Sequence, residues 1–253
     1  MHAQTFLKWI PFMNTKEVFM VRLQKIAGLP FQQASTFLLG ILCFAIPFVN
    51  LLTSIFGLGF LIDLSQQIQQ GTYKTPFFRA RHFLNGLATV LIGIIWFMPV
   101  ILIASYVGIT LYDSSTITAL PAGLAFEHTP TRGVLYALLT IVAVTYFLCA
   151  YFVPAALMAY AQHKRVSAAF SRTVFQGALT SKYLIGWLLA LVLSVALATF
   201  VVLFRNVLFA LLPTLGQTPS IAGQITFFII LGLIVYVNLV WTFGLYADSW
   251  PKI

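Results

Sequence analysis

The chain has 253 residues, of which 60% are hydrophobic and only 8% are charged, and its mean hydropathy is +0.97. Soluble domains carry roughly 25% charged residues, so this composition excludes a water-soluble globule and indicates an integral membrane protein. The net charge of +9 would suggest nucleic-acid binding in a soluble protein. Here most basic residues lie between long apolar runs, where the excess of Lys and Arg on the cytoplasmic side explains them. We therefore expect no nucleic-acid partner.

The chain is expected to form a single transmembrane domain over residues 1–253. Residues 1–28 are predicted to be a cytoplasmic or interfacial amphipathic segment, because an apolar stripe is flanked there by Arg22 and Lys25. This segment has no basic region followed by an apolar core and a small-residue cleavage site, so we expect it to be retained. The membrane bundle itself is predicted over residues 29–253.

The first long stretch without a charged residue covers residues 26–62. It is too long for one membrane helix and barely long enough for two, since a helix needs about 20 apolar residues to cross the hydrocarbon. Pro47 and Asn50 interrupt it, and Pro disrupts a helix interior. The sequence leaves open two short spans, a re-entrant loop or one kinked helix.

The distribution of basic residues favours a hairpin or re-entrant pair around Pro47. With such a pair, 12 of the 14 basic residues fall on one side, and only Arg132 and Arg205 fall on the other. The 12 are Lys8, Lys16, Arg22, Lys25, Lys74, Arg79, Arg81, Lys164, Arg165, Arg172, Lys182 and Lys252. A single kinked helix would give 8 against 6. The positive-inside rule therefore predicts both termini in the cytoplasm.

Each of the later charge-free stretches predicts one membrane span. These stretches cover residues 83–112, 133–162, 183–204 and 206–247. In the last of them, turn-forming residues precede a helix predicted over about 224–246. The fold class is therefore an all-α integral membrane protein with about six membrane segments and additional amphipathic interfacial helices.

Three positions inside the later spans are candidates for intramembrane function, in addition to Pro47 and Asn50. Pro99 and Pro154 are predicted to kink their helices, since each removes a backbone donor. Asn238 lies near the centre of the last helix, where a buried amide could bind a ligand or pack against another helix. Helix packing is the favoured interpretation for Asn238.

A second amphipathic helix is predicted over residues 164–178. Val166, Phe170 and Val174 repeat every four residues, while Arg165 and Arg172 face the other way. Basic residues near such a surface attract anionic lipid. The candidate lipid contacts are Arg22, Lys25, Arg79, Arg81, Lys164, Arg165 and Arg172.

No catalytic motif is present in the sequence. There is no GxSxG, HExxH, P-loop or GxGxxG pattern, and the five acidic residues do not pair at a spacing suited to acid and base catalysis. Cys43 and Cys149 both lie in apolar runs, which excludes a CxxC metal or redox site. We expect no enzymatic activity, no cofactor and no metal.

A series of small, proline and aromatic landmarks resembles a prokaryotic membrane family, domain of unknown function 4013. The landmarks are Gly57-Leu58-Gly59-Phe60, Gly71, Pro76, Gly86, Pro154, Ala168-Ala169-Phe170, Tyr183-Leu184 and Gly244-Leu245-Tyr246. The resemblance covers about residues 34–246, with Phe60 where the family is expected to prefer Tyr. It implies a six-segment helical protein without an assigned activity.

Two function hypotheses follow. The first is a non-enzymatic subunit or scaffold of a membrane assembly, or a lipid-binding bundle, with membrane lipids and either copies of itself or other membrane subunits as partners. The alternative is a small-solute channel or permease that uses the proline-kinked helices. Both place the protein as a multi-pass protein in the prokaryotic cytoplasmic membrane.

Overall fold

The computed structural model describes residues 22–45, 50–117, 132–214 and 221–251, and these residues contain helices and no strands. The principal helices are α2 (Ala34–Ala45), α3 (Asn50–Gln69), α4 (Arg81–Ile117), α5 (Arg132–His163), α6 (Arg172–Ala178), α7 (Ser181–Thr214) and α8 (Ile221–Ser249). Two short 3-10 helices, η2 (Leu29–Phe31) and η3 (Val166–Phe170), join them. The all-α prediction is therefore confirmed.

Four of the described helices are long and apolar enough to cross a membrane. Their spanning parts are Arg81–Gly108, Tyr136–His163, Ser181–Asn206 and Thr226–Ser249, in α4, α5, α7 and α8. These spans coincide with the four later charge-free stretches of the sequence. α4, α5 and α7 extend past their charge-free stretches at both ends, whereas α8 begins inside its stretch, close to the start predicted at about residue 224.

The N-terminal third differs from a simple pair of spans. α2 has only 12 residues, too few to cross the hydrocarbon alone. The helix Arg22–Phe31 before it meets α2 at an angle of 76°, so these two together form a broken span or a re-entrant loop. The described residues therefore contain four spans, or five with the bent pair, and the count of six stays a prediction.

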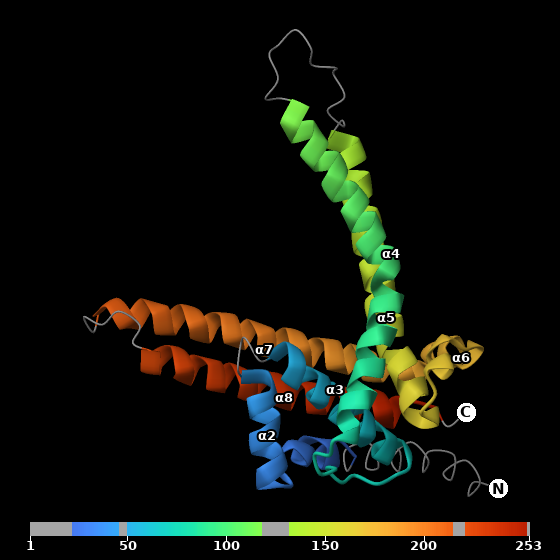
Figure 1. The fold of residues 1–253 in the computed structure, drawn as a ribbon, viewed down its shortest axis with the longest axis vertical. Coiled ribbons are helices and arrows are strands. Elements are labelled where there is room, and N and C mark those ends of the chain that lie inside the picture. The colour runs from blue at the N-terminus through green and yellow to red at the C-terminus, as the bar shows by residue number, and fades with distance from the viewer. Residues whose placement is uncertain (1–21, 46–49, 118–131, 215–220, 252–253) are drawn as a thin grey trace, which may run out of the picture.

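Two helical hairpins leave a common base in different directions. Figure 1 shows α4 and α5 lying side by side as one long arm, and α7 and α8 as the other. α4 begins at the base and α5 ends there, and the same holds for α7 and α8. The shorter elements α2, α3 and α6 lie around this base, where most of the buried core is found.

The contact between α3 and α4 depends on two glycines. A Cβ on Gly59 would lie 1.7 Å from the carbonyl oxygen of His82, and a Cβ on Gly86 would lie 1.7 Å from that of Ile55. The two backbones can approach this closely only where neither helix carries a side chain. Asp63 lies one turn after Gly59 in α3, and His82 lies one turn before Gly86 in α4. Asp63 and His82 face each other, so the glycine contact brings a polar pair together.

The predicted single helix over residues 164–178 is in fact two short helices. η3 ends at Phe170 and α6 begins at Arg172, with Ser171 between them in an extended conformation. The Ser171 hydroxyl donates to the carbonyl of Ala168 at 2.7 Å, and such local bonds from Ser compete with helical backbone bonds. Val174 is consequently buried whereas Phe170 is exposed, so the predicted apolar stripe is not one face.

Candidate functional site

A buried carboxylate ties three helices together at the base. Asp63 of α3 is only 4% exposed. Its Oδ2 lies 2.9 Å from Arg81 Nη2, and its Oδ1 accepts a 2.6 Å hydrogen bond from Lys164 Nζ, just after α5. Asn85 Nδ2 also donates to Oδ1 at 2.8 Å. We call Asp63, Arg81, His82, Asn85 and Lys164 the Asp63 cluster.

The imidazole of His82 links the Asp63 cluster to the chain that enters α4. Its Nδ1 accepts the backbone N–H of Arg79 at 3.1 Å, so its proton resides on Nε2, which lies 3.1 Å from Asp63 Oδ2. The ring is completely buried. His82 and Asp63 together therefore fix the backbone of Arg79 and the side chain of Arg81.

The charges of the Asp63 cluster outweigh its burial. Burial by itself raises the pKa of the Asp63 carboxyl, but hydrogen bonds from His82 and Lys164 hold that pKa well below its usual range. This carboxylate lies at the base, outside the four spans. It stays ionised, because its pKa is lowered. For Lys164, burial lowers the pKa although the bond to Asp63 opposes the shift.

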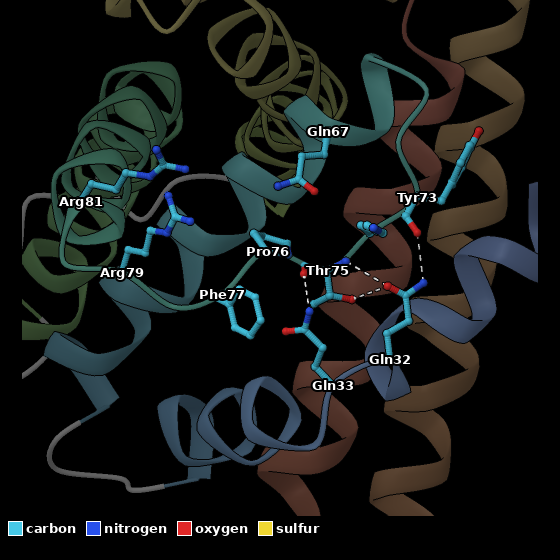
Figure 2. Close-up of a pocket in the computed structure, with 10 residues that line it drawn as sticks. Gln32, Gln33, Gln67, Tyr73, Thr75, Pro76, Phe77, Arg79 and Arg81 are labelled. Carbon is cyan, nitrogen blue, oxygen red and sulfur yellow. Dashed lines mark hydrogen bonds between the residues drawn. The ribbon is translucent and has the colours of Figure 1, made fainter.

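The loop between α3 and α4 is fixed by two glutamines that precede α2. Gln32 Oε1 accepts the backbone N–H of Thr75 at 2.9 Å, and Gln32 Nε2 donates to the carbonyl of Tyr73 at 3.1 Å. Gln33 Nε2 donates to the carbonyl of Thr75 at 3.2 Å. The two side-chain amides thus satisfy the backbone N–H and C=O groups of this irregular segment, as the backbone of a neighbouring strand would in a sheet. Figure 2 shows these bonds.

Asp248, at the end of α8, collects a second set of polar contacts at the base. It accepts a hydrogen bond from the Tyr73 hydroxyl and lies 3.4 Å from Arg22 Nη1, while its backbone carbonyl accepts from Lys182. Burial, followed by the bond to Asp248 and its charge, raises the pKa of Tyr73, so this hydroxyl remains a donor. Lys25 stacks on the Tyr73 ring at 5.5 Å from its centroid.

The loop and the start of α4 enclose an open cavity of about 580 Å³, which we call the basic groove. It is lined by Gln32, Gln33, Gln67, Tyr73, Lys74, Thr75, Pro76, Phe77, Arg79 and Arg81. In Figure 2, Arg79 and Arg81 extend from one side of the groove, and Gln32 and Gln33 lie on the other. Among the described residues, the side chains of Lys74 and Arg79 have no ion-pair partner, so they remain available to an anion.

The seven predicted lipid contacts divide into two groups. Four of them have partners within the protein: Arg22 with Asp248, Lys25 with Tyr73, and both Arg81 and Lys164 with Asp63. The other three, Arg79, Arg165 and Arg172, are exposed, and none forms an ion pair with a described residue. Lipid contact by any of the seven stays a prediction.

The candidate intramembrane positions that the structure describes lie on four different helices. Pro99 lies inside the continuous helix α4, and Pro154 lies inside α5. Asn50 begins α3, and Pro47 falls at 46–49, outside the described residues. Asn238 Oδ1 accepts hydrogen bonds from Ser194 at 3.3 Å and Thr242 at 3.4 Å, which links α8 to α7. Its contacts thus match the favoured packing interpretation.

Sequence reasoning missed the residues that organise the base. No motif in the sequence indicates a role for Asp63, Gln32, Gln33, His82 or Asn85. One available signal is that Asp63 is an acidic residue that directly ends the first charge-free stretch. His82 and Asn85 are three residues apart, on one face of the following helix, where they could have been paired with it.

Within the described part of the chain, no three His, Cys, Asp or Glu side chains come close enough together to hold a metal ion. The long apolar helices and the polar base define a multi-pass, all-helical membrane protein. The chain belongs to the family described as "Protein of unknown function (DUF4013)", whose sequence profile matches residues 38–210. This confirms the resemblance. No curated protein and no solved structure matches the chain.

Proposed function

We propose that this protein is a non-enzymatic membrane protein that binds anionic lipid at its cytoplasmic face and serves as a subunit or scaffold of a membrane assembly. The observation that carries the proposal is the basic groove. It presents Lys74 and Arg79 without ion-pair partners among the described residues, beside Arg81, whose side chain is 58% exposed. Each basic residue near an anionic membrane surface contributes about 1 kcal/mol to binding.

Exposed aromatic residues support a lipid over a soluble anion as the occupant. Phe77 lines the basic groove and is 60% exposed, and Phe31, in the neighbouring η2, is 59% exposed. Large apolar side chains beside cations suit the boundary between headgroups and acyl chains. The groove therefore offers charge for a phosphate and an apolar rim for the lipid tails.

The cytoplasmic orientation follows from the position of the charges. The Asp63 and Asp248 contacts, together with the basic groove, all lie at the base, where α4 and α7 begin and α5 and α8 end. Basic residues are concentrated on the cytoplasmic side of membrane proteins. We therefore assign the base to the cytoplasm and the far ends of both hairpins to the outside of a prokaryotic inner membrane.

The low burial of the α4 and α7 spans supports association with a partner. Only 11% of the residues are buried in the most apolar windows of α4 and of α7. These faces can contact lipid alone, but small residues on them, such as Gly108 of α4, allow close approach of another helix. For the permease alternative, Asn238 would have to face a solute path, and its bonds to Ser194 and Thr242 support packing instead.

Lipid counting tests the proposal. The full chain would be extracted into nanodiscs of phosphatidylcholine containing a minor fraction of phosphatidylglycerol, and the phosphatidylglycerol retained per chain would be measured by mass spectrometry. A Lys74→Gln, Arg79→Gln double variant should retain less anionic lipid than the unchanged chain, because the groove loses its two cations without ion-pair partners. Lys182→Gln removes an exposed charge at the same face, outside the groove and outside the predicted lipid contacts, and should have little effect. Equal retention by the double variant and the unchanged chain would refute the groove as a lipid site.

A further inference from the structure

A second polar surface lies beside Lys164, where its neighbours His163 and Arg165 line a cavity separate from the basic groove. A cavity of about 670 Å³ is lined by Gln162, His163, Arg165, Ser167, Ala168, Ser171 and Thr173. A smaller cavity of about 200 Å³ is lined by Gln66, Gln69, Gln70, Gln162, Trp250 and Pro251. Because both cavities share Gln162, they adjoin. We call the larger one the hydroxyl pocket and the smaller one the amide pocket.

The backbone at Lys164 is shaped so that the hydroxyl pocket can form. Lys164 has a φ of 53°, the only positive φ at a non-glycine residue in the described chain. This left-handed conformation is unfavourable for a residue with a Cβ, and such strain concentrates at functional sites. The turn directs the Lys164 side chain inward to Asp63 and leaves its neighbours, His163 and Arg165, to line the pocket.

The hydroxyl pocket has the chemistry of a phosphate site. Arg165 is an exposed cation with no ion pair to any described residue, and a guanidinium suits the oxygens of a phosphate. The Thr173 hydroxyl donates to Ser171 Oγ at 2.6 Å, since the Ser171 hydroxyl donates to the carbonyl of Ala168, and these bonds hold both side chains in place at the pocket wall. Ser167 adds a third hydroxyl, and His163 a ring that can donate to an anion.

The amide pocket has the chemistry of a site for hydroxyl groups. Gln69 donates through Nε2 to the carbonyl of Met158 at 3.1 Å, but its Oε1 is buried and has no hydrogen-bond partner. Trp250 Nε1 donates to Gln162 Oε1 at 3.0 Å and so orients that amide. Amides can both donate to and accept from an alcohol, so a pocket lined by Gln66, Gln69, Gln70 and Gln162 suits hydroxyl groups.

We propose that the two adjoining pockets bind a phosphate group carried on a polyol, with the phosphate at Arg165 and the hydroxyls at the glutamines. A soluble polyol phosphate and the headgroup of a polyol phospholipid share this chemistry. Phe175 and Leu179, which are exposed on and just after the nearby α6, favour the lipid source because they suit the membrane interface. This site is independent of the basic groove, with which it shares no lining residue.

Binding of defined probes tests the site in both forms. The full chain in phosphatidylcholine nanodiscs would be titrated calorimetrically with glycerol 3-phosphate, with inorganic phosphate and with glycerol. In a second arm, the nanodiscs would contain either phosphatidylglycerol or phosphatidic acid, and retained lipid would be counted by mass spectrometry. The soluble arm detects a free polyol phosphate, and a preference for phosphatidylglycerol over phosphatidic acid detects the lipid headgroup.

The variants separate the two pockets from each other and from the basic groove. Arg165→Gln should weaken binding of the phosphate-bearing probe about tenfold, as loss of a charged hydrogen bond does. Gln70→Ala should remove the preference for a polyol-bearing probe while leaving the affinity for phosphate unchanged. Lys182→Gln, outside both pockets and outside the predicted lipid contacts, should leave the binding in both arms intact. The Lys74→Gln, Arg79→Gln double variant should leave the calorimetric binding of glycerol 3-phosphate intact.

Three outcomes would overturn the proposal. One is the absence of saturable binding in both arms. Another is binding that Arg165→Gln leaves unchanged. The third is an equal loss in Arg165→Gln and Lys182→Gln, which would show attraction by net charge in place of a built site.

Discussion

Asp63 and Asp248 are the two acidic residues whose side chains the structure describes, and each gathers basic residues from distant parts of the chain. Asp63 joins α3, the start of α4 and the residue after α5. Asp248 joins the end of α8 to Tyr73 and Arg22. In a chain with 14 basic and 5 acidic residues, the acids therefore determine which bases are fixed and which stay available for anions.

Replacing Asp63 by Asn should destabilise the protein. The change leaves Arg81 and Lys164 without their counter-charge, and breaking a buried ion pair is costly. Because both cations are partly exposed, we expect a loss of about 2–3 kcal/mol, visible as a lower thermal midpoint. Unfolding can be followed in nanodiscs by reaction of the buried Cys149 with a thiol dye. Gln24→Ala, at an exposed position, is the control and should unfold like the unchanged chain.

The stability that Asp63 contributes should depend on pH in a defined direction. Its pKa in the folded protein lies below the ordinary value of about 3.9. The contribution is therefore fully present above about pH 4 and is lost as the pH falls toward the folded-state pKa. The difference in thermal midpoint between the unchanged chain and Asp63→Asn should shrink between pH 6 and pH 3. A difference that stays constant over this range would contradict the role of the carboxylate.

The sequence shows which residues are basic, but it does not show which of them form ion pairs. Arg81 and Lys164 lie 83 positions apart in the sequence, and only the packing of α4 against α5 brings both to Asp63. Gln32 and Gln33, which bond to the backbone of the loop at Thr75, belong to no recognisable sequence motif. Such contacts depend on tertiary structure, so composition and periodicity could not reveal them.

At the scale of elements, the close contact of α3 and α4 should be sensitive to a single methyl group. A Gly86→Ala change would place a Cβ 1.7 Å from the carbonyl oxygen of Ile55, so the helices must separate. We expect a loss of about 2–3 kcal/mol, as for overpacked cores. Gly93→Ala, on the same helix with nothing within 4 Å of the added Cβ, is the matched control. It should be neutral or slightly stabilising, because Ala favours helices by about 1 kcal/mol over Gly.

The same two variants test whether the contact matters for the site. Separation of α3 from α4 would move Asp63 away from His82, and His82 holds the backbone of Arg79. Gly86→Ala should therefore retain less phosphatidylglycerol in the nanodisc experiment than Gly93→Ala does. Equal midpoints and equal lipid retention for the two variants would show that the glycine contact is not required.

Elements of strong, uniform pattern were predicted well from the sequence. Charge-free stretches located α4, α5, α7 and α8, because the hydrocarbon thickness sets a minimum length for an apolar helix. The segments with mixed pattern were predicted less well. Between residues 164 and 178 a regular apolar spacing hid the break at Ser171, where a side-chain hydroxyl competes for the backbone.

For the whole molecule, the exposed arms predict association. The most apolar stretches of the α4 and α7 spans bury only 11% of their residues within one chain, and a small residue such as Gly108 leaves room for another helix. Gentle extraction from native membranes followed by native mass measurement should give a particle heavier than one chain and its lipids. A particle with the mass of a single 28.1 kDa chain plus lipid would exclude a stable partner.

We infer that the polar base faces the cytoplasm and that both hairpins cross the membrane from it. Single cysteines at Thr72, at Ser115 and at Gln4, in a chain without Cys43 and Cys149, test it with a membrane-impermeant thiol reagent. Thr72 is exposed in the loop at the base, Ser115 lies near the far end of α4, and Gln4 precedes the described residues. In intact cells we predict labelling at Ser115 alone, with Thr72 and Gln4 labelled only after the membrane is opened. Labelling of Thr72 in intact cells would contradict the orientation, and labelling of Gln4 together with Ser115 would contradict the N-terminal hairpin.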